Sequence, residues 1–545
     1  MRAHFIGRWL AIAGLVLLTG CATSIATRAP DGRLDVQLPA EGTDGYVLLK
    51  VVSTRPISLL NPKWQQITLI SAQGVRHEVP DLTPMAVGVF GGSAVPTESL
   101  HFGRLPPGEY EFSSAGSIGP GPGLLLALIA SDHASLEKQV PRFKVEAGRL
   151  ANLGTVVFSP STGDKEPAQI ILLGGARGTA ESMRALTDDS RNAPVLRPGG
   201  GWLQMPTDEA QAISRARELV SMLSPIGSRS GARMVAGSHL GEIVERVAPG
   251  RWTSEPLDTL ARVSFASCWK DATCVAGSEF GRYAIKRPGA SWEAHRLSNE
   301  YGQVASIQDL SEGRALFVVT DRLKGARVLV QDQLGNDEAV PKELSAGIQD
   351  TDEAKLPVLM LDHPDALLMA RNVPGFRRES LVTRVDKQSL RVTTNREKFW
   401  VSNWQVLQDG EIAVTRMNGM TTYFTSSKDG GKTWVSTERT VPIGTYWRDQ
   451  SRALGIQPTP GFSTVSNQVT QTTDGGKTWT PLGQPFRSAD FAARIVYADD
   501  QEILAEDGKR VFSSLDAGKT WTPRFPRVGA NSSSVAGASR LQSGL

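Results

Sequence analysis

The sequence predicts an all-β protein: a C-terminal β-propeller of about seven four-stranded blades, preceded by a small β-sandwich-like domain and a short helical linker. The first observation is a phrase ending in Gly-Lys-Thr-Trp that occurs three times, with its tryptophans 45 and then 42 residues apart. A repeat of that length is typical of one four-stranded unit copied around a ring. The second is a series of short alternating segments, separated by Gly, Asn and Asp turns, along the 545 residues. This spacing predicts antiparallel strands.

The repeated phrase has the composition of a tight turn between two strands. Each copy has Asp two residues, Gly four residues and Trp seven residues after a Ser or Thr. We expect the carboxylate to accept hydrogen bonds from N–H groups of its own turn, the Gly to take a conformation closed to residues with Cβ, and the Trp to pack between neighbouring blades. The predicted turn residues are Ser427, Asp429, Gly431, Trp434, Thr472, Asp474, Gly476, Trp479, Ser514, Asp516, Gly518 and Trp521.

The three aspartates are therefore interpreted as structural residues and not as catalytic acids. Calcium ligation is the competing interpretation, but it needs further carboxylates that the phrase does not supply. The phrase resembles the Asp-box, or BNR repeat, of sialidases, sortilin-type receptors and photosystem assembly factors. Residues 404–434 and 447–479 are most similar to the blades of the photosystem stability/assembly factor type. The resemblance covers the ring only, implies a propeller, and transfers no substrate or partner.

Weaker copies extend the ring toward the N-terminus. Residues 234–252 and 263–292 are strand-and-turn segments that end in a Gly shortly before a Trp, and the second has Arg287 in place of the Asp. Residues 303–398 contain apolar runs without the phrase. At 42–45 residues per blade, the ring is expected to span 231–526 with roughly seven blades. Six or eight blades would also fit this length.

Short strands and turns before the ring predict a separate module. Residues 34–160 contain strands at intervals typical of a β-sandwich-like domain. Residues 161–230 are expected to form a linker with helices at 179–189 and 208–223, the second capped by Thr207. The small, polar residues 527–545 predict a disordered tail.

The N-terminus has the pattern of an export signal. Arg2 and Arg8 precede an apolar stretch that is too short for a transmembrane helix. It ends in Leu-Thr-Gly-Cys21, which is similar to the bacterial lipobox. The resemblance implies a lipoprotein signal peptide over 1–20, acylation of Cys21 with palmitate-type chains, and a lipid-anchored tether over 21–33. Ala22 is not Asp, which favours the outer membrane, on either its periplasmic or its surface side. An ordinary secretory leader is the alternative.

Export makes a disulfide available to the two remaining cysteines, Cys268 and Cys274. They can be bridged only if the chain turns back between them, and the strand pattern on either side predicts that hairpin. The alternative is a pair of buried free thiols.

Charge and motifs exclude several classes of function. The formal net charge is +3 and no basic run occurs, so nucleic-acid binding is not predicted. The histidines form no cluster with ligand spacing, and the Gly174–Gly178 loop lacks the Lys-Ser/Thr of a phosphate-binding loop. We therefore predict no metal site, no cofactor and no catalytic residue.

The leading hypothesis is an exported, lipid-anchored, non-catalytic propeller that binds a protein or glycan partner or acts as an envelope scaffold. The alternative is a sialidase-like or other glycoside hydrolase with a diverged active site. A sialidase needs three arginines around a substrate carboxylate, a Tyr–Glu nucleophile pair and an acid/base Asp. The Phe/Tyr-Arg-Ile-Pro phrase that carries the first arginine of that family does not occur in the sequence. Three arginines that converge on one pocket would favour the alternative.

Overall fold

The described residues form two compact units, one from residues within 1–86 and 96–216 and one from 87–95 and 217–545. The computed structural model describes residues 26–28, 33–36, 43–54, 66–82, 98–116, 134–135, 140–159, 169–191, 196–205, 208–220, 234–321, 325–344, 358–373, 378–418, 421–442, 444–460, 465–488, 493–507 and 510–525. The predicted leader with Cys21, Thr207 and the predicted disordered tail beyond Phe525 lie outside these residues.

The first unit contains two large sheets that enclose one apolar core, as predicted for a β-sandwich-like domain, and a separate two-stranded sheet formed by its first two described strands. One sheet has the strand order β11-β10-β3-β6, with β12 on β10, and the other has the order β13-β9-β7-β4-β5, with β8 on β7. Val47, Leu49 and Val51 of β3 are buried against Phe112 and Phe143 of the second sheet. The strands are β1 (Ala26–Arg28), β2 (Leu34–Val36), β3 (Gly45–Ser53), β4 (Gln66–Ser71), β5 (Arg76–Pro80), β6 (Glu98–Leu105), β7 (Gly108–Gly116), β8 (Ala134–Ser135), β9 (Phe143–Val145), β10 (Arg149–Ser159), β11 (Gln169–Leu173), β12 (Arg197–Pro198) and β13 (Gly200–Trp202).

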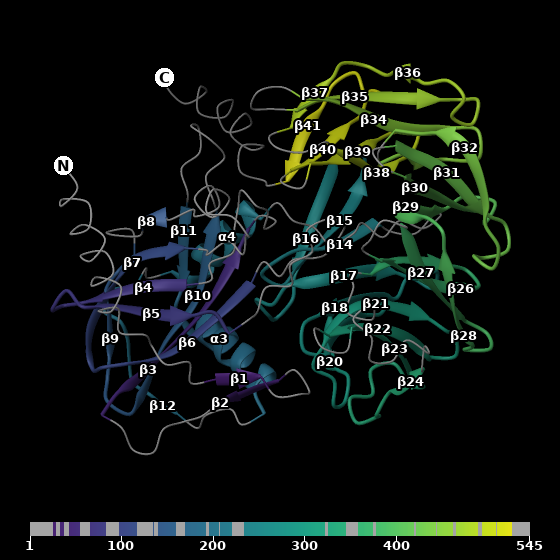
Figure 1. Ribbon diagram of the computed structural model, residues 1–545. Coiled ribbons are helices and arrows are strands. Elements are labelled where there is room, and N and C mark those ends of the chain that lie inside the picture. The colour runs from purple at the N-terminus through teal and green to yellow at the C-terminus, as the bar shows by residue number, and fades with distance from the viewer. Residues whose placement is uncertain are drawn as a thin grey trace, which may run out of the picture. The chain divides into compact units, whose positions relative to one another are not determined.

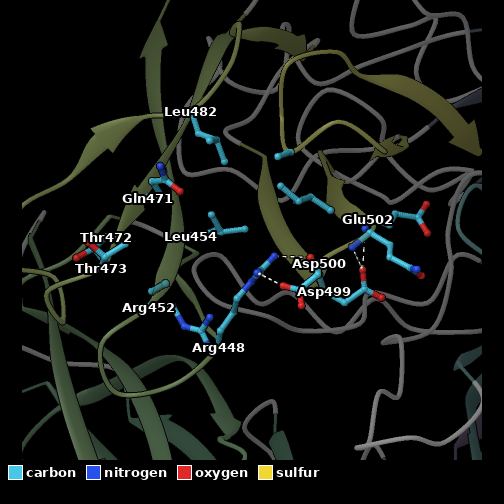
Figure 2. Close-up of a pocket in the computed structure, with 14 residues that line it drawn as sticks. Arg448, Arg452, Leu454, Gln471, Thr472, Thr473, Leu482, Asp499, Asp500 and Glu502 are labelled. Carbon is cyan, nitrogen blue, oxygen red and sulfur yellow. Dashed lines mark hydrogen bonds and ion pairs between the residues drawn. The ribbon is translucent and has the colours of Figure 1, made fainter.

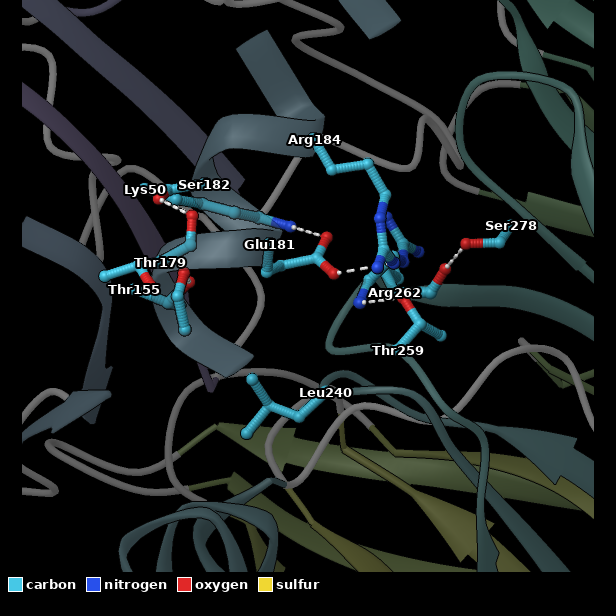
Figure 3. A network of polar contacts seen from close by, with 12 residues as sticks. Lys50, Thr155, Thr179, Glu181, Ser182, Arg184, Leu240, Thr259, Arg262 and Ser278 are labelled. Carbon is cyan, nitrogen blue, oxygen red and sulfur yellow. Dashed lines mark hydrogen bonds and ion pairs between the residues drawn. The ribbon is translucent and has the colours of Figure 1, made fainter. Parts of the chain in front are cut away.

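Helix α3 (Ala176–Asp189) covers the other face of the first sheet, so β3 is buried on both sides. Lys50 of β3 points toward this helix, and its Nζ lies 3.2 Å from Glu181 Oε1 and 2.8 Å from Glu98 Oε2 (Figure 3). A buried charge is tolerated only where opposite charges compensate it. The two carboxylates therefore explain why a lysine can stand in an otherwise apolar strand.

Helix α4 (Glu209–Leu219) explains the glycine-rich loop before α3. The N–H groups of Arg177 and Gly178 donate to the Glu209 carboxylate at 3.2 and 2.9 Å. A Cβ atom on Gly175 would lie 2.5 Å from the same carboxylate. Amides at a helix N-terminus favour an anion, and here the protein's own side chain takes that place. Asp208 Oδ1 caps α4 by accepting from the N–H of Gln211 at 2.9 Å.

The second unit is a propeller of seven successive antiparallel sheets (Figure 1), as predicted. Each sheet is a meander of strands consecutive in the chain. The blades are blade 1 with β14 (Met234–Gly237), β15 (Glu242–Ala248) and β16 (Arg251–Pro256); blade 2 with β17 (Val263–Cys268), β18 (Cys274–Ser278), β19 (Arg282–Lys286) and β20 (Glu293–Arg296); blade 3 with β21 (Gln303–Asp309), β22 (Ala315–Asp321), β23 (Gly325–Gln331) and β24 (Lys342–Leu344); blade 4 with β25 (Leu359–His363), β26 (Ala366–Val373), β27 (Glu379–Asp386) and β28 (Val392–Glu397); blade 5 with β29 (Trp400–Val406), β30 (Ile412–Asn418), β31 (Thr421–Ser427) and β32 (Val435–Thr440); blade 6 with β33 (Tyr446–Trp447), β34 (Ala453–Pro460), β35 (Val465–Thr472), β36 (Thr480–Pro481) and β37 (Phe486–Ser488); and blade 7 with β38 (Arg494–Ala498), β39 (Ile503–Glu506), β40 (Val511–Ser514) and β41 (Thr522–Phe525).

Blade 1 has three strands among the described residues, against four or five in the others. A Cβ atom on Gly237 of β14 would lie 2.5 Å from Val263 O, just as one on Gly277 of β18 would lie 2.4 Å from Val304 O. Because β18 is the second strand of its blade, β14 is also a second strand. The described part of blade 1 therefore corresponds to strands two to four of the other blades.

Side chains of blades 7 and 1 close the ring. Arg246 of β15 lies 2.5 Å from Glu502 and 3.3 Å from Asp499 of blade 7. Trp252 of β16 packs edge-on against Phe525 of β41, with ring centroids 5.6 Å apart. An ion pair and an aromatic contact thus join the two ends of the ring-forming chain.

The predicted disulfide is confirmed in blade 2. Cys268 ends β17 and Cys274 begins β18, so the two residues stand opposite each other in the ladder with their Cα atoms 4.0 Å apart. The hairpin that the strand pattern predicted is what brings the sulfur atoms together.

Candidate functional site

The three copies of the repeated phrase form the same hydrogen-bonded turn. In blade 5, Asp429 Oδ1 accepts from the N–H groups of Lys432 and Thr433 at 3.0 and 2.9 Å, and Asp429 Oδ2 accepts from Thr433 Oγ1 at 2.6 Å. Ser427 Oγ donates to Asp429 at 2.8 Å and accepts from the N–H of Gly431 at 2.8 Å. Asp474 and Asp516 accept the same bonds from Thr478 and Thr520 in blades 6 and 7.

These bonds make the aspartates poor proton donors. Burial acts to raise the pKa of Asp429, but the hydrogen bonds from Thr433, Ser427 and Lys432 outweigh it and hold the pKa at about 2. Hydrogen bonds from Thr520 likewise lower the pKa of Asp516 to about 2. A general acid for catalysis needs a pKa near the working pH. The geometry therefore agrees with a structural role for these carboxylates.

The tryptophans that end the turns lie between neighbouring blades. Trp434 packs against Phe399, with ring centroids 6.0 Å apart, and against apolar residues of blade 4. Trp479 packs against the core between blades 5 and 6, and Trp521 packs 4.6 Å from Phe486. In blade 2, Trp292 occupies the corresponding place next to blade 1, although its turn has no Asp.

The Asp-containing turns and the first turn of each blade lie on one face of the ring. Both turn types connect the first strand of a blade to its second, or the third to its fourth. The N–H of Gly475 donates to Ser451 O at 2.8 Å, which joins the two turns of blade 6. We call this the turn face. The first turns of blades 2, 3, 5, 6 and 7 each contain an Asp that accepts from the N–H two residues further on: Asp271, Asp309, Asp409, Asp449 and Asp499.

A pocket of about 180 Å³ opens on the turn face between blades 6 and 7 (Figure 2). Blade 6 supplies Arg448 and Arg452 from its first turn, Leu454 from β34, and the residues around Thr473 from its Asp-containing turn. Blade 7 supplies the hairpin from Asp499 to Ile503. We take this pocket as the candidate functional site because it combines concavity with charged side chains from two blades.

The arginines around this pocket are already paired with carboxylates of the protein. Arg448 lies 2.9 Å from Asp500 and also donates to the backbone carbonyl of Asp499. Arg452 Nε donates to Asp449 at 2.6 Å. Arg246 of blade 1 binds the same hairpin through Glu502 and Asp499. Three arginines thus converge here, but their partners are internal carboxylates.

Two buried polar atoms of this pocket have no hydrogen-bond partner within the described part of the chain. They are Glu502 Oε1 and Arg448 Nε. The Glu502 side chain is 0% exposed, and its other oxygen accepts from Arg246. An unmatched buried donor or acceptor costs about 1–3 kcal/mol, and more when it is charged. Both atoms belong to residues that line the pocket, and they lie beneath its surface.

Tyr497 contacts Asp499 of the pocket, and its hydroxyl is not activated. Its hydroxyl donates to Asp499 Oδ2 at 2.7 Å. Burial, together with this hydrogen bond, raises the pKa of Tyr497 above its usual value. Burial acts to raise the pKa of Asp499, but hydrogen bonds from Tyr497, Gln501 and Glu502 lower it overall. A nucleophile needs a lowered pKa or an effective base, whereas here the pKa of Tyr497 is raised and the lowered pKa of Asp499 makes its carboxylate a weak base.

Metal-binding and membrane-spanning features were searched over the described ranges. Within these ranges, no three or more His, Cys, Asp or Glu side chains are grouped so that they could hold a metal ion. No helix among the described residues is long and apolar enough to cross a bilayer.

Sequence reasoning identified the turns and the disulfide but not the pocket. Arg448, Asp500 and Glu502 carry no sequence signal of their own, because Arg448 meets Asp500 across 52 residues and Glu502 meets Arg246 across 256. The available signal was the recurrence of charged residues in the first turns of consecutive blades, at 448–452 and 499–502.

No protein-family model and no curated protein matches this sequence. Several solved propellers are similar in structure. A polysaccharide lyase, the PL25 ulvan lyase, has 10% sequence identity and a TM-score of 0.36 over 55% of this chain and 90% of its own. YCF48 bound to D1 peptide has 13% identity and a TM-score of 0.34 over 52% of this chain and 90% of its own. Virginiamycin B lyase from Staphylococcus aureus has 11% identity and a TM-score of 0.33 over 55% and 92%. At these values, the similarities assign no activity, substrate or partner to this chain.

Proposed function

We propose that this chain is an exported, lipid-anchored, non-catalytic β-propeller that binds its ligand on the turn face, at the pocket between blades 6 and 7. The proposal rests on how the charged groups of that pocket are paired. The guanidinium groups of Arg448 and Arg452 are engaged by Asp500 and Asp449, while Glu502 Oε1 and Arg448 Nε have no partner within the described residues. Such a site can hold a ligand through hydrogen bonds but has no group poised for proton transfer or attack.

The hydrolase alternative has specific support, and the same contacts weigh against it. Tyr497 does donate to a carboxylate, and two arginines, Arg246 and Arg448, do bind one hairpin. However, a sialidase arginine must be free to hold a substrate carboxylate, and the nearest arginines already hold Asp499, Asp500 and Glu502. The resemblance of the turns to the Asp-box is common to enzymes and binding proteins and does not favour either.

The export part of the proposal depends on the lipobox-like sequence at Cys21. The disulfide between Cys268 and Cys274 supports it, because disulfides persist mainly in oxidising compartments. An anchor at Cys21 would retain the ring in the cell envelope, where it could bind a partner or organise a complex.

The test of the non-catalytic assignment is a hydrolysis assay. The purified chain is incubated with a panel of fluorogenic α- and β-glycosides, including a sialoside, from pH 4 to 8. We expect no turnover above that of a heat-denatured sample. Hydrolysis that disappears in Tyr497→Phe would overturn the assignment and support the glycosidase alternative.

The anchor is tested separately by labelling cells with radioactive palmitate. We expect the full chain to be labelled and to fractionate with the outer membrane, and Cys21→Ser to be unlabelled and released from the membrane. Labelling that persists in Cys21→Ser would contradict the assignment of the acylated residue.

A further inference from the structure

We infer that the pocket between blades 6 and 7 binds an uncharged sugar residue of a glycan. The inference rests on the proposed binding function and specifies the chemistry of the ligand. It follows from the net charge of the pocket, from its polar groups, and from its apolar wall.

Charge comes first. Two guanidinium groups line the pocket, against the three carboxylates of Asp499, Asp500 and Glu502. Asp500 is 93% exposed and faces any ligand that approaches from solvent. An anionic ligand would have to compete with these carboxylates for Arg448 and would be repelled by them. The site therefore disfavours a sulfated or carboxylated sugar.

The polar groups of the pocket favour a ligand that both donates and accepts. Glu502 Oε1 and Arg448 Nε belong to residues that line the pocket and have no partner among the described residues, but both atoms are buried, so a ligand reaches them only if neighbouring side chains shift. The side-chain amides of Gln471 and Gln501 also line the pocket, and each carries a donor and an acceptor. A hydroxyl group donates and accepts at the same time, so neighbouring hydroxyls of one sugar ring can satisfy both kinds of partner.

The volume and the apolar wall of the pocket fit one sugar ring. The pocket has a volume of about 180 Å³, which suits a small ligand group such as a single sugar residue. Leu454, Leu482 and Ile503 line the pocket between its polar groups. They offer a surface for the C–H groups of a sugar, whose burial is favourable. A peptide segment is the competing ligand, since its backbone also donates and accepts.

The test uses the full mature chain with two matched variants. Thr473 lines the pocket, and no hydrogen bond of its side chain is found in the described structure, so Thr473→Trp fills the space without removing a polar partner. Lys428 holds the same position of the turn in blade 5, away from the pocket, so Lys428→Trp is the control. Leu515 at this position in blade 7 indicates that a large side chain is tolerated. Binding is measured on an array of neutral and acidic glycans, then by calorimetry with the best neutral oligosaccharide.

We expect the wild type and Lys428→Trp to bind the same neutral oligosaccharide within twofold, and Thr473→Trp to bind it at least tenfold more weakly. Gln501→Ala, which leaves the backbone bond of Gln501 to Asp499 in place, should weaken binding several-fold. Binding to acidic glycans only, to no glycan, or with equal affinity to Thr473→Trp would overturn the inference. Capture of a peptide or protein that Thr473→Trp abolishes would also overturn it but leave the proposed binding function intact, whereas glycoside hydrolysis would overturn the function itself.

Discussion

Blades 5 to 7 and blades 1 and 2 form the turn between their third and fourth strands by different means. In blade 5, Asp429 accepts four hydrogen bonds from residues that lie within four positions of it. In blade 2, Arg287 stands in that place, and the turn is closed by a backbone bond from the N–H of Ala290 to Arg287 O at 3.0 Å. Both types keep a positive-φ glycine and a tryptophan packed against the preceding blade.

This difference separates what builds a blade from what fixes its turn face. The glycine and the tryptophan are common to both types, so they serve the packing of neighbouring blades. The complete repeated phrase with its Asp occurs in blades 5 to 7, and the candidate pocket lies between two of these, whereas blade 4 has a different turn in which Asp386 accepts from Ser389. Blade 2 instead has a disulfide in its first hairpin. The carboxylates therefore rigidify the part of the turn face that carries the pocket.

The largest expected change in the free energy of unfolding comes from replacing the turn glycine by alanine. Each turn type has such a glycine, Gly431 in blade 5 and Gly289 in blade 2. A Cβ atom on Gly431 would lie 2.2 Å from Leu368 Cδ2, whereas one on Gly289 would meet nothing within 4 Å. Both residues have positive φ, at 83° and 77°. Gly431→Ala should cost about 3 kcal/mol from strain and overpacking together, and Gly289→Ala about 1 kcal/mol from backbone strain alone. Denaturant unfolding followed by tryptophan fluorescence measures both, and equal costs would contradict this account of the packing.

The next effect concerns the covalent link of blade 2. Replacing Cys268 and Cys274 by serine should lower the free energy of unfolding by about 2 kcal/mol, because the closed loop is short. Reduction of the wild type with dithiothreitol in denaturant should give the same loss. A double mutant as stable as the oxidised protein would show that hydrogen bonds alone hold this hairpin.

Removing the Asp carboxylate from one turn of blades 5 to 7 should lower the free energy of unfolding by a smaller amount. Asp429→Ala should cost about 1 kcal/mol at pH 7, similar to the loss of a capping side chain at a helix N-terminus. The pKa of Asp429 is about 2 in the folded ring and about 3.9 in an unfolded chain. Its contribution is therefore complete above about pH 4 and is lost as the pH falls toward 2. Stability curves of wild type and variant should converge over that range, and a constant difference down to pH 2 would exclude the carboxylate as the cause.

The smallest change in the free energy of unfolding is expected from placing an Asp in the turn of blade 2, which naturally lacks it. Arg287→Asp in blade 2 should change stability by no more than about 0.5 kcal/mol. It removes an exposed ion pair, Arg287–Glu293 at 2.8 Å, which contributes little in solvent, and it offers Ala290 and Ser291 a carboxylate acceptor. A loss above 2 kcal/mol would mean that the turn of blade 2 depends on Arg287 in a way its contacts do not explain.

Much of the ring could be predicted because its signals are local. The turn residues lie within eight positions of one another, and the bonds they make span at most four residues. The same glycine and tryptophan also predict the blade segments at 234–252 and 263–292, which lack the Asp of the repeated phrase. Helix α3 begins three residues before the predicted position because the Glu209 carboxylate holds its first amides, and that contact spans more than 30 residues.

The sequence by itself determined the blade repeat, the turns closed by an Asp carboxylate, and the disulfide. Each of these depends on hydrogen bonds or a covalent bond between residues close in the chain. Only the tertiary structure decided where a pocket forms and which charges meet in it. Arg246 reaches Glu502 across 256 residues, and Arg448 reaches Asp500 across 52. Neither pairing has a period or a spacing in the sequence, because it exists only when the last blade closes against the first and the sixth blade packs against the seventh.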